Sequence, residues 1–506
     1  MATGEATRSP RTQEPDSRRW WILALCGLGQ LMVVLDLTVV NIALPKAQVA
    51  LGFSNDDRQW IVTAYALAFG GLLLLGGRLS DRIGRKWTFI VGMAGFAAAS
   101  AVGGAAQSFL MLAGARAVQG VFAALLAPST LSLLTTTFSE PRERGKAFGI
   151  FSAIAGSGSA IGLLVGGVLT TYLSWRWCLY VNDGIAVVGL VGAMWLLHGG
   201  TGDDRVRIDD PGILAGVGGL VALVFGFSEA ALDGWVSATT LLPLGLAVVL
   251  LASFVLIERR AAHPILPLGV LLDRRRGASY LTILLLAIGM FGVFLFLTYY
   301  LEAIVGYSAV RAGLAFIPLT VAVIAGSVVT NMRLLPRFGP RAIVPVAAVV
   351  AGLAMIYFAQ LTLSTGYWTG IFPPGVLFGL AMGAIFGCCL NMATVGTGPD
   401  TAGVASALVT TGQQVGGSIG TSLLNTIAAS AAAAYLVTHA TRAFLARHAH
   451  SITQTAVWAQ AQVHSYDVSF YVASGFIFAA GVGAAVLYPP RRVSVPERRP
   501  AVVAAS

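Results

Sequence analysis

Two charged residues of this chain lie inside long apolar segments. Asp36 is part of LDLTVVNIALP (35–45), and Arg116 precedes Gln119 and Gly120 on one predicted helix face. A charge at the centre of a bilayer costs about 2.5–3.5 kcal/mol on insertion scales, so such side chains face a cavity or each other. A carboxylate whose distance from a guanidinium changes between two states can load and release a proton. We therefore interpret Asp36 as a proton site with Arg116 as its partner; a purely structural ion pair is the alternative.

The composition places these segments in a membrane. The 506 residues are 56% hydrophobic and 11% charged, with a mean hydropathy of +0.79, whereas soluble domains carry about 25% charge. Because lipid offers no partners to backbone polar groups, apolar runs of about 20 residues must cross it as helices. The sequence thus predicts an all-α polytopic membrane protein with 14 transmembrane helices, near 20–44, 59–77, 87–107, 109–133, 147–173, 176–197, 212–231, 239–257, 278–301, 312–331, 341–362, 369–394, 402–430 and 469–488.

The basic residues indicate the orientation. With both termini inside, 25 of the 32 Lys and Arg residues fall in inside segments, 6 in outside loops, and Arg116 in a span. Cytoplasmic loops carry this excess of positive charge. We expect a multi-pass protein with both termini cytoplasmic, and the net charge of +10 then requires no nucleic-acid partner. Arg outnumbers Lys 29 to 3, which suggests a bacterial gene and hence the bacterial cytoplasmic (inner) membrane.

The chain contains an internal repeat. RLSDRIGRK (78–86) recurs as RLLPRFGPR (333–341), an offset of 255, and a stripe of three glycines in the fifth span recurs in the thirteenth at an offset of 254. A parallel repeat of two six-helix halves is a transporter architecture with its binding site between the halves. The predicted units are a disordered cytoplasmic tail (1–19), an N-terminal six-helix half (20–198), a two-helix insert with flanking cytoplasmic loops (199–277), a C-terminal six-helix half (278–488) and a cytoplasmic tail (489–506).

Several of these motifs together resemble those of a known family. GGRLSDRIGRK (76–86) is similar to the loop signature of the major facilitator superfamily, and LDLTVVNIALP resembles the first-span signature of its 14-spanner drug/proton antiporter branch. ARAVQG (115–120), SWRWCLYVN (174–182) and QQVGGSIG (413–420) are similar to other signatures of that branch. The resemblance covers nearly the whole chain. It implies a multidrug efflux transporter that exports hydrophobic drugs or antibiotics in exchange for protons, for general resistance or self-resistance.

The resemblance also implies roles for two groups of residues. In the family, the loop after the second span braces the two halves on the cytoplasmic side, and a glycine-rich stripe in the fifth span closes the leak path between the halves. Two departures weaken the match, because Pro336 replaces the acid in the second loop copy and Leu163 stands where the family usually has proline. The loop residues are Gly77, Asp81, Arg82, Gly84 and Arg85, and the stripe residues are Gly158, Gly162, Gly166 and Gly167, for which ordinary helix packing is the alternative.

A second candidate acid and a pocket complete the predicted site. Asp183 lies within the sixth span if that helix begins at Trp177, and is interfacial and inert if it begins later. By resemblance, the first, fourth, ninth and twelfth spans line a pocket. An apolar, aromatic and Met-bearing cavity suits bulky hydrophobic drugs. The predicted pocket residues are Gln30, Asn41, Gln119, Met290, Phe291, Phe294, Phe378, Met382 and Phe386.

Other classes of chemistry are not indicated. The only Gly-Lys, Gly145–Lys146, lacks the glycine and hydroxyl residues of a phosphate-binding loop, and the four cysteines have no metal-ligand spacing. We expect no enzyme activity, no metal and no cofactor other than the proton-motive force. The expected partners are a small hydrophobic or cationic drug, protons and lipid, with the chain acting as a monomer. Proton-coupled uptake of a small metabolite and a non-transporting membrane sensor remain as alternatives.

Overall fold

The computed structural model describes residues 16–138, 140–197, 210–261, 264, 266–395, 401–445 and 452–490. These residues form helices and connecting turns and contain no strand. The predicted tails, apart from residues 16–19 and 489–490, lie outside the described residues. Residues 16–19 were predicted to belong to the N-terminal tail, but they are helical, because the first helix begins at Asp16.

Each of the 14 predicted spans coincides with helical structure of the bundle, and the tenth, 312–331, is divided among two α-helices and a π-helical turn. The N-terminal half comprises α1 (Asp16–Leu51), α2 (Asn55–Ile83), α3 (Arg85–Gly104), α4 (Phe109–Thr137), α5 (Pro141–Tyr172) and α6 (Trp177–Leu196). The insert comprises α7 (Asp210–Asp233) and α8 (Ala238–Arg260), followed by the short α9 (Leu268–Leu272). The C-terminal half comprises α10 (Arg274–Tyr299), the π-helical turn η1 (Tyr300–Ile304), α11 (Ala309–Ala315), α12 (Ile317–Val329), the π-helical turn η2 (Thr330–Leu334), α13 (Leu335–Phe338), α14 (Pro340–Phe358), the π-helical turn η3 (Tyr367–Ile371), α15 (Phe372–Thr394), α16 (Ala402–Leu445) and α17 (Ile452–Leu487).

The lengths of these helices fit a membrane crossing. Thirteen helical stretches among the described residues are long and apolar enough to span a bilayer. The fourteenth helix is α5, whose described apolar part, Ile161–Tyr172, is shorter although the whole helix has 32 residues. The all-α polytopic fold predicted from the sequence is confirmed.

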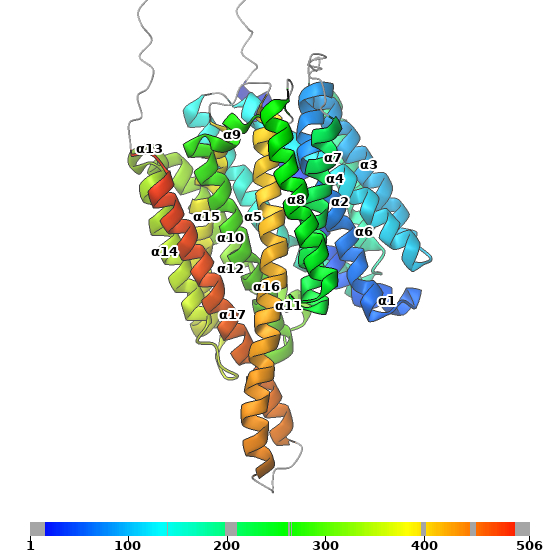
Figure 1. Ribbon diagram of the computed structural model, residues 1–506, viewed down its shortest axis with the longest axis vertical. Coiled ribbons are helices and arrows are strands. Elements are labelled where there is room, and N and C mark those ends of the chain that lie inside the picture. Colours follow the sequence, from blue (N-terminus) through cyan, green and yellow to red (C-terminus); the bar gives the residue numbers. More distant parts are fainter. Residues whose placement is uncertain are drawn as a thin grey trace, which may run out of the picture.

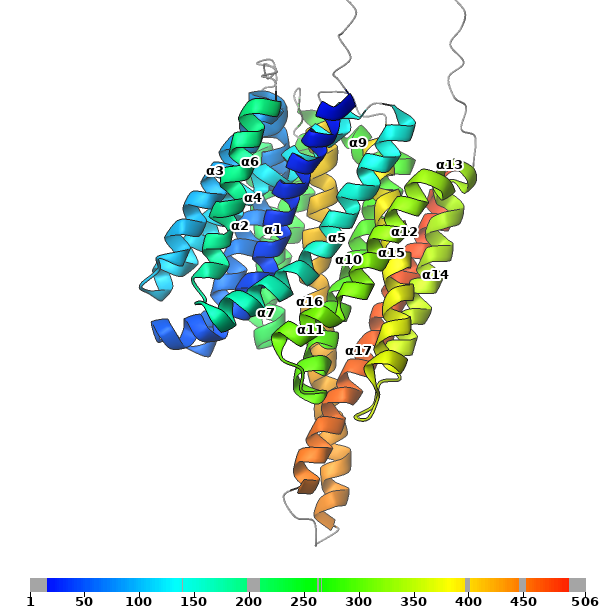
Figure 2. The same cartoon turned by 180° about the vertical axis from the view of Figure 1, so that it is seen from behind.

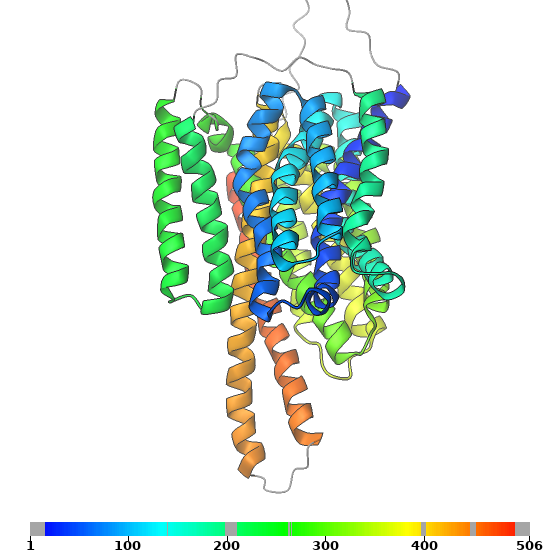
Figure 3. The same ribbon diagram turned by 90° about the vertical axis from the view of Figure 1, so that its right-hand side faces the viewer.

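Two helices connect the two sides of the bundle. Figure 2 shows α1, α3 and α6 on one side and α12, α14 and α15 on the other. Between them, α5 packs against both α1 and α12, and α16 packs against both α10 and α2. The insert stands at the edge of the bundle (Figure 3), where α7 contacts α2 and α16 and α8 packs against α7. The insert therefore covers the seam between α2 and α16.

The two ends of the bundle differ. In Figure 1, α9 and α13 lie at the end where α17 finishes, and Figure 2 shows that α1 begins at this same end. We name this end the termini side and the opposite end the hairpin side. Both copies of the repeated loop turn at a glycine with positive φ, Gly84 at 96° and Gly339 at 73°. Glycine alone adopts such a backbone without strain, so each copy keeps its tight turn.

The hairpin side carries a feature that the hydropathy pattern did not predict. The thirteenth and fourteenth spans were expected to end at residue 430 and begin at residue 469, but α16 continues to Leu445 and α17 begins at Ile452. The two helices project beyond the rest of the bundle (Figures 1 and 3), and the rings of Tyr435 and His464 meet across them at 5.2 Å. The extension begins in the run AASAAAA (428–434), and alanine is the strongest helix former while only weakly apolar.

The resemblance implied that the glycine stripe of α5 lies between the two halves. In the structure, the stripe instead packs against α1, within the N-terminal half. A Cβ added at Gly158 would lie 2.7 Å from Val34 of α1, one at Gly162 would collide with Thr38, and one at Gly166 would lie 3.3 Å from Val39 Cα. Gly167 is buried as well. Small residues allow the two backbones to approach closely, so the stripe positions α1 against α5.

The repeated stripe makes the same contact in the C-terminal half. Cβ atoms at Gly412, Gly416 and Gly420 of α16 would meet backbone atoms of α10. The α16–α10 contact therefore corresponds to the α5–α1 contact. The helix α10 is the counterpart of α1, which carries Asp36.

Candidate functional site

Asp36 and Arg116 meet inside the N-terminal half. The Arg116 guanidinium donates through Nη1 to Asp36 Oδ2, which joins α4 to α1. Both side chains are buried, with exposed fractions of 0% for Asp36 and 1% for Arg116. Breaking such a buried pair by removing one partner is strongly destabilising, because the other charge is left uncompensated. The position of each charge therefore depends on the other.

Two amides complete the surroundings of the carboxylate. Gln119 Nε2 donates to Asp36 Oδ1 at 3.2 Å, and Asn182 Nδ2 of α6 donates to the same oxygen at 2.9 Å. Both amides also donate to Ser100 Oγ of α3, at 2.6 Å from Gln119 and 3.4 Å from Asn182. Helices α1, α3, α4 and α6 thus meet at one fully buried polar cluster, which we call the Asp36 network: Asp36, Ser100, Arg116, Gln119 and Asn182.

The spacing on α4 explains why one helix supplies two partners. Arg116 and Gln119 are three residues apart and therefore share a helix face, and Arg116 Nη1 donates to Gln119 Oε1 at 2.8 Å. This bond fixes which end of the Gln119 amide faces the carboxylate. On the other side of the guanidinium, the ring of Tyr65 from α2 lies 4.3 Å from Arg116 Cζ. Arg116 is therefore held by a carboxylate, an amide and an aromatic face.

The C-terminal half has no counterpart of this acid. Adding the offset of 254 to position 36 gives 290, which is Met290, and adding it to 116 gives 370, which is Gly370. The pair of Asp36 and Arg116 therefore occurs in one member of the repeat.

The loop after α2 contacts the opposite half on the termini side. Gly403 N, at the start of α16, donates to Asp81 Oδ1 at 3.3 Å, and a carboxylate is favoured at a helix N-terminus by the helix dipole. Gly77 lies against Gly403, because an added Cβ would be 2.8 Å from its carbonyl oxygen. Arg85 donates to Ser132 Oγ at 2.8 Å and lies 4.0 Å from Asp81, and Arg82 is exposed.

Comparison with known proteins identifies the family. Residues 26–421 match the sequence profile of the Major Facilitator Superfamily. The chain belongs to the major facilitator superfamily. The resemblance inferred from its motifs is confirmed, and the chain is accordingly a membrane transporter rather than an enzyme.

Two relatives are named as a resistance protein and an export protein. The chain is 46% identical to the puromycin resistance protein pur8 of Streptomyces alboniger over 97% of this chain and 95% of the relative. It is 36% identical to the cephamycin export protein CmcT of Amycolatopsis lactamdurans over 84% of this chain and 88% of the relative. Among solved structures, the human organic anion transporter MFSD10 (TETRAN) matches with a TM-score of 0.61 at 14% identity, covering 93% of this chain and all of that one. This last likeness shows the superfamily fold alone.

A further contact between the halves of this superfamily member was missed from sequence. Arg144, near the start of α5, donates through Nη2 to Thr394 Oγ1 at 2.7 Å and through Nε to Asn391 Oδ1 at 3.3 Å, both on α15. Asn391 in turn donates to Asn331 Oδ1 on η2 at 3.2 Å. The second loop copy lacks an acid, and Arg144 provides another polar connection on the same side. A basic residue in a predicted inside loop gives no signal that separates it from the other basic residues there.

The predicted pocket residues lie in different surroundings within the described structure. Gln119 belongs to the Asp36 network, Asn41 is exposed and donates to Leu37 O at 3.0 Å, and Gln30 is half-buried. Phe378 and Met382 are buried in the apolar core of the C-terminal half, against which Met290, Phe294 and Phe386 pack. The side chain of Phe291 lies outside the described residues.

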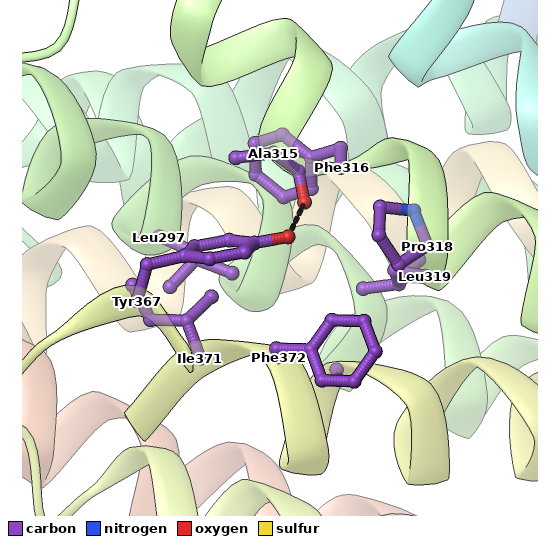
Figure 4. A pocket seen from close by; sticks show the side chains of 9 residues that line it. Leu297, Ala315, Phe316, Pro318, Leu319, Tyr367, Ile371 and Phe372 are labelled. Atoms are coloured by element: carbon purple, nitrogen blue, oxygen red, sulfur yellow. Dashed lines mark hydrogen bonds between the residues drawn. The ribbon is translucent and has the colours of Figure 1, made fainter. Parts of the chain in front are cut away.

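A small pocket lies instead at the hairpin side of the C-terminal half. Figure 4 shows Phe316, Pro318 and Phe372 around it, with the Tyr367 hydroxyl donating to Ala315 O at 2.8 Å. None of the nine predicted pocket residues lines it. The pocket residues therefore remain a prediction.

Asp183 lies beside the network without joining it. The helix α6 begins at Trp177, as required for Asp183 to lie within the span. Its neighbour Asn182 reaches Asp36, but none of the hydrogen bonds among the described residues joins Asp183 to the network. Among those residues there is also no group of three His, Cys, Asp or Glu side chains that could hold a metal ion.

Proposed function

We propose that this transporter exports small hydrophobic or cationic drugs in exchange for protons, from a bacterial cytoplasmic membrane in which both termini are cytoplasmic. Four relatives are named for antibiotic resistance or export: the puromycin and cephamycin proteins above, a tetracenomycin C resistance and export protein, and a lincomycin resistance protein. Nearly full-length similarity to the first makes puromycin the first compound to test. Acting as a monomer, the protein draws on the proton-motive force and needs no bound cofactor.

The observation that carries the proton coupling is the burial of Asp36. A carboxylate that is 0% exposed and faces a permanent guanidinium changes its proton affinity whenever its distance from that cation changes. Alternation between two global states supplies such a change. In this cycle, Asp36 binds a proton from the outer side, drug binding on the inner side promotes its release, and Arg116 stabilises the carboxylate that remains.

One embedded acid in the network implies one proton per cycle. Export of a monovalent cation is then electroneutral, and export of a neutral drug is electrogenic. For a neutral drug, the proton crossing 100 mV supplies about 2.3 kcal/mol, enough for roughly 50-fold accumulation. A measured stoichiometry of two would assign a role to Asp183.

The test is proton release from proteoliposomes on adding puromycin, with the membrane potential clamped. Wild type should release protons, Asp36→Asn should not, and Asp183→Asn should behave as wild type. Release that survives in Asp36→Asn contradicts the assignment of the proton site. Binding of puromycin without release from any variant would favour a non-transporting sensor, and puromycin uptake along the proton gradient would favour an importer.

A further inference from the structure

We infer that Asn182 is an amide switch that reads the protonation state of Asp36: its NH2 group serves the carboxylate, and after a half-turn of the amide its carbonyl oxygen serves the carboxylic acid. The inference rests on the proposed proton-coupled function and adds a positioning residue to it. It follows from one unsatisfied atom. Asn182 is fully buried, yet its Oδ1 has no hydrogen-bond partner among the described residues.

The network as it stands suits only the ionised form of Asp36. Arg116, Gln119 and Asn182 all present donors to the two carboxylate oxygens. When one proton binds, an O–H bond forms on the carboxyl group and that hydrogen needs an acceptor. Oδ2 faces the guanidinium, which stays charged, so the proton goes to Oδ1. Oδ1 is the oxygen that faces Asn182, at 2.9 Å.

Only one of the two amides is free to turn. Gln119 Oε1 accepts from Arg116 at 2.8 Å, and turning that amide would place its NH2 group against the guanidinium. Asn182 has no such constraint, because its oxygen is unpartnered. Turning Asn182 exchanges its Oδ1 and Nδ2 positions, so the oxygen then faces both Asp36 Oδ1 and Ser100 Oγ, which now lie 2.9 and 3.4 Å from Nδ2.

Turning the Asn182 amide leaves the same number of its polar groups unsatisfied in both protonation states of Asp36. In the ionised state the Asn182 amide donates twice and its oxygen is unsatisfied; in the protonated state its oxygen accepts from the Asp36 and Ser100 hydroxyl groups and its NH2 group is unsatisfied. Each state leaves one polar group of the same side chain without a partner. The desolvation cost is therefore similar in both states, and Asn182 does not trap Asp36 in either one.

Other groups facing Asp36 do not supply this function. The titratable neighbours are Arg116 on α4, Tyr65 on α2 and Cys178 on α6. Arg116 only donates, whereas Tyr65 places its ring over Arg116. On α3 the neighbour is the uncharged Ser100, and α5 presents its glycine stripe to α1. Among the described neighbours of Asp36, Asn182 alone offers an acceptor by turning in place.

Infrared difference spectra between the protonated and ionised protein test this switch. In wild type, a protonated-carboxyl band should appear together with a change in an asparagine side-chain carbonyl band, identified by isotope-labelled asparagine; the chain has only six asparagines. In Asn182→Leu the asparagine change should vanish and the carboxyl band should move to higher frequency, since its O–H has lost an acceptor. Drug-triggered proton release should slow about tenfold or more, because hydrogen bonds to a buried charged group are lost.

Controls separate this inference from the proposed function. A carboxyl band that persists in Asp36→Asn overturns the proposed proton site itself. A band that disappears in Asp36→Asn but keeps its frequency in Asn182→Leu overturns the switch alone, as does labelled wild type with no asparagine change. Asn182→Asp offers a second variant: two carboxyl groups at hydrogen-bond distance retain one proton between them, so release should move to a more alkaline pH. An unchanged pH profile in a folded Asn182→Asp protein argues against a direct contact.

Discussion

The ring of Tyr65 lies 4.3 Å from the guanidinium carbon of Arg116, on a different helix from Asp36. In the proposed cycle, this contact matters when Asp36 takes up a proton, because Arg116 then loses its only ion-pair partner among the described residues. A desolvated cation over an aromatic face gains about 2 kcal/mol. Tyr65 therefore stabilises Arg116 in the state in which the carboxylate is neutral.

Two substitutions of Tyr65 distinguish the contribution of its ring from that of its hydroxyl group. The hydroxyl has no hydrogen-bond partner among the described residues, so Tyr65→Phe should transport at the wild-type rate. Tyr65→Leu should lose about 2 kcal/mol of stabilisation of the protonated state, so fewer transporters carry a proton when the drug binds, and the rate of drug-driven proton release should fall by more than tenfold. Rates in proteoliposomes for the two variants side by side measure this. Equal rates in Phe and Leu variants would show that the ring contributes only packing.

The ion pair itself predicts a pattern of stabilities. Arg116→Gln leaves the Asp36 carboxylate buried without its cation, and breaking a buried pair in this way costs about 3–5 kcal/mol. The double variant Asp36→Asn with Arg116→Gln buries no charge and should recover most of that loss. Thermal unfolding in detergent, followed for both single variants and the double, checks this. Destabilisations that add up in the double variant would contradict an energetic coupling between the two residues.

The sequence alone identifies residues whose burial has a large free-energy cost. A charge inside an apolar run needs a partner, so Asp36 and Arg116 could be paired before the fold was known. Asn182 was not assigned, although it is a polar residue in an apolar span next to the singled-out Asp183. An amide costs less to bury than a charge, and its signal was therefore overlooked. Which oxygen it faces depends on the packing of α1, α3, α4 and α6.

The glycine stripes show a second limit. Their spacing identifies one face of a helix, but not the helix that this face touches. Gly162 packs on α1 rather than on the C-terminal half. The α16–α17 hairpin shows a third limit, since hydropathy identifies the apolar part of a helix and gives no end point for a helix that continues beyond its apolar run.

A methyl group at Gly162 should disturb the site without touching it. Its Cβ would collide with Thr38 of α1 and lie 3.1 Å from Leu35 O, and Leu35 is adjacent to Asp36. Overpacking of this kind costs about 1–3 kcal/mol, so Gly162→Ala should unfold at lower temperature and transport more slowly. Gly114→Ala is the matched control, since an added Cβ there has no atom within 4 Å. Similar behaviour of both variants would mean that α1 is not positioned by this stripe.

Asp81 and Arg144 each hold the halves together on the termini side. Asp81 accepts from Gly403 N at 3.3 Å, and Arg144 donates to Thr394 at 2.7 Å. Hydrogen bonds to charged groups contribute about 1.5–3 kcal/mol. Asp81→Asn and Arg144→Ala should therefore each increase opening of this side by about tenfold or more.

Labelling of a buried cysteine measures this opening. Ala407 is fully buried where α16 meets Gly77, so the Ala407→Cys thiol should react with a membrane-impermeant maleimide only when the halves separate. The four native cysteines are buried, and the parent protein gives their background. Arg311→Ala provides the matched control, because Arg311 stacks on Tyr307 within the C-terminal half, 4.1 Å from its ring centroid. Labelling that rises in Asp81→Asn but not in Arg144→Ala would show that the α5–α15 contact follows closure and does not stabilise it.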